Sequence, residues 1–228
     1  MHRGLLNQQA SGGGGAPVAI TAGSFASGTA TAAPSIPSGS NDELLLLIAY
    51  NQHDSGSWAA ITGWTNIWDE DSTQGNDRSL GIWWRLRDGT EGSTVTVTRT
   101  SGGSEVVEAF VAKFTGNDTT TPILEIDGIT EAEAVTAGNT TTPASNSGGM
   151  GGASGDMALH VLVSQTSMGT TLTKPSGTTD LNNSTTITSE EFASAYETLS
   201  GTVGAAAWST SGTASTRYLS ATVIVAQA

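Results

Sequence analysis

Apolar residues occur along this chain in short bursts separated by Gly, Ser, Thr and Asn. In residues 93–100 the bursts alternate strictly, so that Val95 and Val97 share one face and threonines take the other. Short alternating bursts divided by turn residues are typical of β-strands. The same criteria predict strands at 18–22, 28–32, 44–52, 62–68, 80–87, 107–114, 123–126, 157–165, 192–199, 203–209 and 218–228.

The strongest of these bursts, residues 44–48, is an unbroken apolar run. Such a run predicts a strand that is covered on both faces, or a short buried helix. We favour the strand because the run is short and Asn51 follows closely. Residues 189–196 are the best helix candidate, and no stretch longer than about two turns shows a convincing period of 3.6. The pattern therefore predicts an all-β protein, an antiparallel β-sandwich.

The first sixteen residues differ from the rest, being polar and then Gly-rich at 12–15. They predict a flexible N-terminal arm, either a disordered terminus or a segment that orders against a neighbouring subunit. Leu5 and Leu6 are the apolar anchor of such an arm. Residues 17–228 are expected to form a single β-sandwich domain, since sandwiches of this length are commonly one domain.

A weak internal repeat relates residues 31–51 to residues 141–165. Each stretch has a Thr/Pro segment, a turn with Asp42 or Asp156, and then an apolar strand. This similarity indicates two related halves of one sandwich. Coincidence between Thr/Ser/Gly-rich loops is the alternative.

Charge is sparse and lopsided, with 8 basic and 21 acidic residues among 228 and a net charge of −13. This balance argues against binding to nucleic acid or to an anionic membrane, since both attract basic proteins. It suits a soluble protein whose partner carries cations or basic patches. Few lysines also lower the entropic cost of ordering the surface in an assembly.

The sequence also lacks the residues of cysteine chemistry and the apolar segments of membrane targeting. The chain has no cysteine, which excludes disulfides and thiolate metal sites. The N-terminus lacks the apolar core of a signal peptide, and no apolar run approaches the ~20 residues that span a bilayer.

Five of the six tryptophans fall between residues 58 and 84. Trp83 and Trp84 are adjacent on an expected strand, so they should point to opposite faces. An outward-facing Trp would contact a neighbouring subunit or stack on a sugar ring. Trp58, Trp68, Trp83 and Trp84 are therefore candidate binding or interface residues, although core packing is the alternative for most of them.

An acidic segment contains Asp69, Glu70, Asp71 and Asp77. Calcium favours such oxygen ligands, so Asp69, Asp71 and Asp77 are weak candidates for a Ca²⁺ site. The spacing is not that of an EF-hand, because Gly75 falls one place late. We therefore expect no metal, and a solvated acidic loop instead.

Catalytic motifs are missing from the sequence: there is no nucleophile elbow, no H-E-x-x-H and no phosphate-binding loop. His160 falls within an expected core strand and is interpreted as a packed or rim residue, and His53-Asp54 alone does not indicate acid–base chemistry. Scattered carboxylates could pair on folding for glycoside hydrolysis, but nothing points to it. These are Glu105, Glu108, Glu125 and Asp127. We expect a protein that is not an enzyme and needs no cofactor.

One set of segments resembles a known family. The order P-S-G-S-N-D-E-L-L-L-L-I-A-Y, G-W-T-N-I, L-G-I-W-W-R-L-R-D-G and V-E-A-F-V-A-K-F-T-G, with the ending S-T-R-Y-L-S-A-T-V-I-V-A, is similar to a β-sandwich, jelly-roll-like domain of virion proteins in tailed bacteriophages. The resemblance covers residues 34–228. Asn41 stands in place of the usual Gly, and the arm before Pro17 is a further departure.

The resemblance implies a structural role in the virion. The leading expectation is a capsid decoration or cement protein that binds the major capsid protein or other virion proteins and stabilises the shell. A homotrimer is expected, since most such components are trimers. A receptor- or glycan-binding module of the tail or a fibre is the alternative, and a polysaccharide-acting enzyme is a third hypothesis.

Overall fold

The computed structural model describes nine stretches of the chain, and statements about structure below refer to them. They are residues 4–5, 16–51, 57–71, 78–100, 105–134, 146–165, 172–184, 190–210 and 216–228. Every regular element within them is a β-strand. Accordingly, these stretches contain no helix that could cross a membrane.

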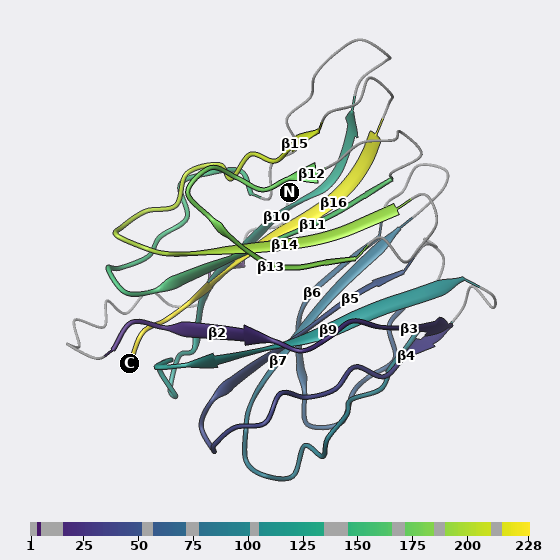
Figure 1. Cartoon of the computed structure of the whole chain (residues 1–228), viewed down its shortest axis with the longest axis horizontal. Helices are drawn as coiled ribbons and strands as arrows, with labels where there is room; N and C mark the ends of the chain where they lie inside the picture. Colours follow the sequence, from purple (N-terminus) through teal and green to yellow (C-terminus); the bar gives the residue numbers. More distant parts are fainter. Residues whose placement is uncertain are drawn as a thin grey trace. The chain divides into compact units, whose positions relative to one another are not determined.

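The chain divides into two compact units (Figure 1). Unit 1 comprises Met1–Val18 and Thr121–Ala228, and unit 2 comprises Ala19–Thr120. Each unit is built on one large antiparallel sheet. The expectation of a single domain for 17–228 stays a prediction.

In unit 2 the strand order is β2-β9-β5-β7-β6, and β3 also pairs with β9. Strand β5 lies at the centre, and all eight of its residues are buried. A short pair, β4 with β8, supplies part of a second layer. The bounds are β2 Ala19–Ala22, β3 Ala26–Thr29, β4 Thr31–Ala32, β5 Leu44–Asn51, β6 Thr65–Asp71, β7 Ser79–Leu86, β8 Val97–Thr98 and β9 Val106–Thr115.

In unit 1 the order is β1-β10-β16-β11-β14-β13. Strand β11 lies between β16 and β14 (Figure 1). The short pair β12 and β15 is separate from this sheet. The bounds are β1 Gly4–Leu5, β10 Ile123–Ala134, β11 Met157–Gln165, β12 Leu172–Thr173, β13 Thr179–Ser184, β14 Glu190–Thr198, β15 Ser209–Thr210 and β16 Thr216–Val225.

The two sheets repeat one topology. The order β9-β5-β7-β6 in unit 2 has the same chain connections as β16-β11-β14-β13 in unit 1. The register agrees as well: Leu44 pairs with Leu86 and Phe114, just as Met157 pairs with Thr198 and Val225. The predicted relation between the two core strands, β5 and β11, is therefore confirmed.

The hydrogen bonds at the start of both core strands fix which residues correspond. Arg87 N donates to Glu43 O at 2.9 Å, and Leu199 N donates to Asp156 O at 2.7 Å. Glu43 therefore occupies the place of Asp156, so the two aspartates of the repeat differ by one position. Asp42 instead stands where unit 1 has a glycine, and like that glycine it has a positive φ, of 68°.

The edge strands β6 and β13 also match. A tight turn precedes each, closed by Trp64 N to Ile61 O at 3.1 Å in unit 2 and by Thr178 N to Pro175 O at 3.3 Å in unit 1. Each then has a register shift at its second residue, between Asn66 and Trp68 or between Asp180 and Asn182. Thr65 opposite Trp84 thus corresponds to Thr179 opposite Tyr196.

The core of unit 2 is apolar. It lies between one face of the large sheet and the layer that contains β4 and β8. That face and its cover form one cluster, comprising Ala32, Ile36, Leu45, Leu47, Ala49, Trp58, Trp83, Val95, Val97, Val107, Ala109 and Val111. Val95 and Val97 are both buried, as the period of two predicts. Full burial of each valine, leucine or isoleucine side chain in this cluster contributes about 1.5–3 kcal/mol.

The all-β, sandwich-like class predicted from the sequence is confirmed. Several boundaries were wrong. The described part of the helix candidate 189–196, residues 190–196, is a strand, because β14 pairs on one side with β11 and on the other with β13. The alternating stretch 93–100 contributes the two-residue strand β8 and isolated bridges at Thr94 and Arg99, and 203–209 contributes a bridge at Val203 and the start of β15. Jelly-roll connectivity and the flexibility of the arm stay predictions.

Candidate functional site

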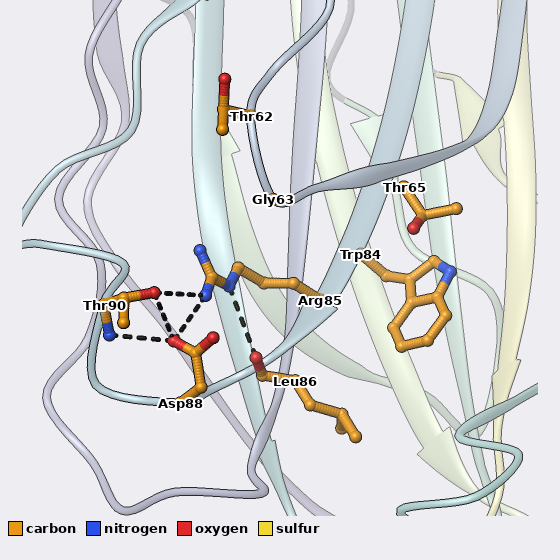
Figure 2. A pocket seen from close by; sticks show the side chains of 8 residues that line it. All are labelled: Thr62, Gly63, Thr65, Trp84, Arg85, Leu86, Asp88 and Thr90. Carbon is orange, nitrogen blue, oxygen red and sulfur yellow. Dashed lines mark hydrogen bonds and ion pairs between the residues drawn. The ribbon is translucent and has the colours of Figure 1, made fainter.

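A pocket of about 440 Å³ lies in unit 2, where the turn before β6 meets the end of β7. Figure 2 shows its lining residues, which are Thr62, Gly63, Thr65, Trp84, Arg85, Leu86, Asp88 and Thr90. Gly63 makes the turn possible, since its φ of +77° is rarely adopted by residues with a side chain. The sequence prediction singled out Trp84 among these residues.

Arg85 organises this pocket. Its Nη2 donates to Asp88 Oδ1 at 2.7 Å and to Thr90 Oγ1 at 3.3 Å (Figure 2). Its guanidinium carbon also lies 6.0 Å from the ring centroid of Trp64. The hydroxyl and amide of Thr90, and then the charge of Arg85, hold the pKa of Asp88 below its ordinary value of 3.8. The pocket thus presents an ionised carboxylate and hydroxyl groups.

Further ion pairs at the same end of unit 2 hold the neighbouring loops. Arg87 Nη1 donates to Glu91 Oε1 at 2.5 Å, and its Nη2 donates to the carbonyl of Pro37. Lys113 Nζ lies 3.5 Å from Glu43 Oε2. These charged groups are bonded to one another and to the backbone, which gives them a structural role.

The adjacent tryptophans of β7 behave as the alternation predicts. Trp83 is buried, with its ring 5.6 Å from that of Trp58 in an edge-to-face arrangement at 88°. Trp84 is half-buried, and its indole extends away from the guanidinium of Arg85 (Figure 2). Trp68 is also buried. Trp58, Trp68 and Trp83 are therefore buried, as the core-packing alternative expects, and Trp84 stays a candidate interface residue.

A second pocket, of about 310 Å³, occupies the corresponding place in unit 1. Glu197 stands at the position of Arg85, one residue beyond the equivalent pair Tyr196 and Trp84. The turn before β13 and the loop after β14 form the walls. The lining residues are Pro175, Ser176, Thr178, Glu197, Gly204, Ala205, Ala206 and Ala207.

Glu197 is held by a buried histidine. Its Oε1 lies 3.3 Å from His160 Nε2, and His160 Nδ1 lies 2.9 Å from Thr222 Oγ1. The hydrogen bond from His160 is the largest effect and holds the pKa of Glu197 below its ordinary value of 4.5; burial opposes it, and the electrostatic interaction with His160 is a smaller lowering effect. His160 and Thr222 have no exposed surface, so Glu197 is the member of the three that reaches the pocket. The prediction of a packed His160 is confirmed.

This polar row distinguishes the two units. Thr222, His160 and Ala195 lie side by side across the sheet of unit 1. Their counterparts in unit 2 are Val111, Leu47 and Trp83, all in the apolar core. Paired residues in adjacent strands share a face, so the same interior position is apolar in one unit and polar in the other.

Three buried carboxylates of unit 1 bind backbone amides. Glu125 Oε2 accepts from Gly151 N at 2.8 Å, and Asp127 Oδ2 accepts from Ser147 N at 2.9 Å. Asp156 accepts from the amides of Ala153 and Gln227. These carboxylates hold the segment before β11 and the end of the chain.

The remaining candidates are only partly covered by the described residues. Asp69 and Asp71 lie in β6 rather than in a loop, and Asp77 falls outside the described residues. Within the described stretches no three His, Asp or Glu side chains gather as a metal-binding group. His53 and Leu6 also fall outside them. Leu5 belongs to β1, which pairs with β10.

No protein family, curated protein or solved structure matches the chain.

The pair of pockets was not predicted from the sequence. One signal for it exists: I-T-G-W-T at 61–65 and P-S-G-T-T at 175–179 share a central glycine and a following threonine. The contact between His160 and Glu197 had no local signal, because it depends on the register of β11 and β14.

Proposed function

We propose that this chain is a structural protein of a tailed-bacteriophage virion, and that it acts as a capsid decoration, or cement, protein that binds and stabilises the shell. The sequence segments that resemble virion β-sandwich domains motivate the proposal. The pairing of the N-terminal segment with a sheet edge is the structural observation that carries it.

Strand β1 pairs with β10 through Gly4 opposite Ile126 and Leu5 opposite Glu125. Within the described residues it pairs with these two positions of the twelve-residue strand β10. Backbone hydrogen bonds do not depend on which copy supplies the added strand. An arm that extends β10 in its own chain is therefore able to extend β10 of a neighbour, and such exchange supports assembly into the proposed trimer.

The experiment compares two chains for binding to empty capsid shells of the phage that encodes them. One is the full chain, and the other lacks residues 1–16. We expect the full chain to co-sediment with the shells and raise their melting temperature, and the shortened chain to bind at least tenfold more weakly. Equal binding of both chains, or absence of the full chain from purified particles, would contradict the proposal.

A receptor- or glycan-binding role in a tail or fibre is the second candidate, and the pocket of unit 2 favours it. Asp88 and Thr90 supply the hydrogen-bonding groups that sugar hydroxyls require, and the half-buried Trp84 also lines this pocket, with its indole directed away from them (Figure 2). Binding on a glycan array that is lost in Asp88→Asn and Trp84→Ala, but kept in Glu197→Gln, would support this role. A blank array would remove it.

A further inference from the structure

The two pockets share two equivalent positions, Thr62 with Ser176 in the turn and Arg85 with Glu197 on the strand, and their charged groups differ in an informative way. In unit 2 the strand β7 supplies a guanidinium, that of Arg85, and the loop that follows supplies the carboxylate of Asp88 at 2.7 Å. In unit 1 the equivalent strand position supplies a carboxylate, that of Glu197. The following loop contributes only Gly204, Ala205, Ala206 and Ala207 to the pocket. At the position where unit 2 has the cation of an ion pair, unit 1 therefore has an anion, and the loop residues that line its pocket supply no opposite charge.

Glu197 has room and capacity for a further partner. Its side chain is 33% exposed, and its Oε1 faces His160, whose hydrogen bond fixes the orientation of the carboxylate. The ammonium group of Lys174, which precedes the turn before β13, donates a hydrogen bond to the carbonyl oxygen of Thr178. In the part of the chain that the structure describes, the ion pair of Glu197 is with His160. The small side chains of the loop leave the pocket open beside the carboxylate.

We propose that this pocket of unit 1 binds a guanidinium group from outside the chain, with Glu197 as its carboxylate partner. In unit 2 the equivalent wall of the pocket holds a guanidinium bonded to a carboxylate, so this part of the fold is compatible with such a pair. A planar guanidinium also bonds a carboxylate more specifically than an ammonium does.

The occupant we assign is an arginine side chain of a protein partner. The net charge of −13 favours a basic partner surface. Because a partly buried carboxylate is less screened than an exposed one, the contact would persist at moderate salt. This inference goes beyond the proposed virion role and does not depend on it.

The test titrates the full chain with capped arginine (N-acetyl-arginine methylamide) and follows backbone amides by NMR. The matched probe is capped citrulline, which has the same shape without the charge. We expect saturable shifts at Ala205, Ala206 and Ala207 with arginine and none with citrulline. Glu197→Gln should weaken binding at least tenfold, while Asp180→Asn, which removes an exposed carboxylate of β13, should leave it unchanged.

Two further experiments keep the test decisive. Ser176→Phe fills the mouth of the pocket and keeps Glu197, so it should also abolish the shifts even if Glu197→Gln fails to fold. Methylguanidinium separates the sources: binding of this ion without binding of capped arginine would assign the pocket to a free guanidino compound. Equal binding of citrulline, or full binding by folded Glu197→Gln, would overturn the proposal.

Discussion

Gly81 lies in β7 against the paired indoles of Trp58 and Trp83. A Cβ atom at this position would come within 2.3 Å of the Trp83 ring and 2.9 Å of Trp58 Nε1. Gly81→Ala should therefore displace the aromatic pair and lower the free energy of unfolding by about 1–3 kcal/mol. Urea unfolding measures this loss. Gly204→Ala is the control, because no atom lies within 4 Å of its added Cβ, and an equal loss in both variants would contradict the packing argument.

At the same scale, Glu197 makes the stability of the folded chain depend on pH. Its pKa is lower in the folded chain than its ordinary 4.5, so the folded state favours the ionised form. The contribution to stability is present above pH 4.5 and is lost as the pH falls through the folded pKa. Carbon-13 NMR of the carboxyl group should find a pKa below 4.5 that rises in His160→Asn. An unchanged pKa in that variant would show that the histidine does not hold the carboxylate.

At the scale of elements, the turns before β6 and β13 depend on a glycine with positive φ. Gly177 has a φ of +87°, and no atom lies within 4 Å of an added Cβ, so strain alone decides the cost of substitution. Gly177→Val should lower the free energy of unfolding by about 1–2 kcal/mol, and Gly177→Asn by less, because Asn tolerates this conformation better. Thermal unfolding of both variants provides the measurement. Equal effects would indicate that the turn is not strained.

Strands could be predicted from the sequence where apolar residues were dense, as in β5, β9 and β11. Strand β13 was missed because Leu181 is its one large apolar residue, and β10 was predicted too short because Ile129 is the one large apolar residue of its second half. Such segments become strands by pairing with neighbours that are distant in the chain. The same long-range register creates the contact of Glu197 with His160, which no local pattern contains.

At the scale of the whole molecule, the chain repeats one sheet topology, and the two copies differ in their interiors. Unit 2 buries Leu47 and Val111 where unit 1 buries His160 and Thr222. An apolar interior contributes mainly to stability, whereas a polar row ending at a pocket can hold a ligand-binding group in place. We therefore expect substitutions in the polar row to change binding at unit 1 while leaving the pocket of unit 2 unaffected.

The repeated sheet is tested most directly by amide hydrogen exchange, followed residue by residue in the full chain. Central strands exchange most slowly because both neighbours must open. The repeat predicts two matching maxima of protection, at β5 and β11, with lower protection at the edge strands β6 and β13. A single maximum, or rapid exchange throughout β11 and β16 while β5 and β9 stay protected, would contradict it.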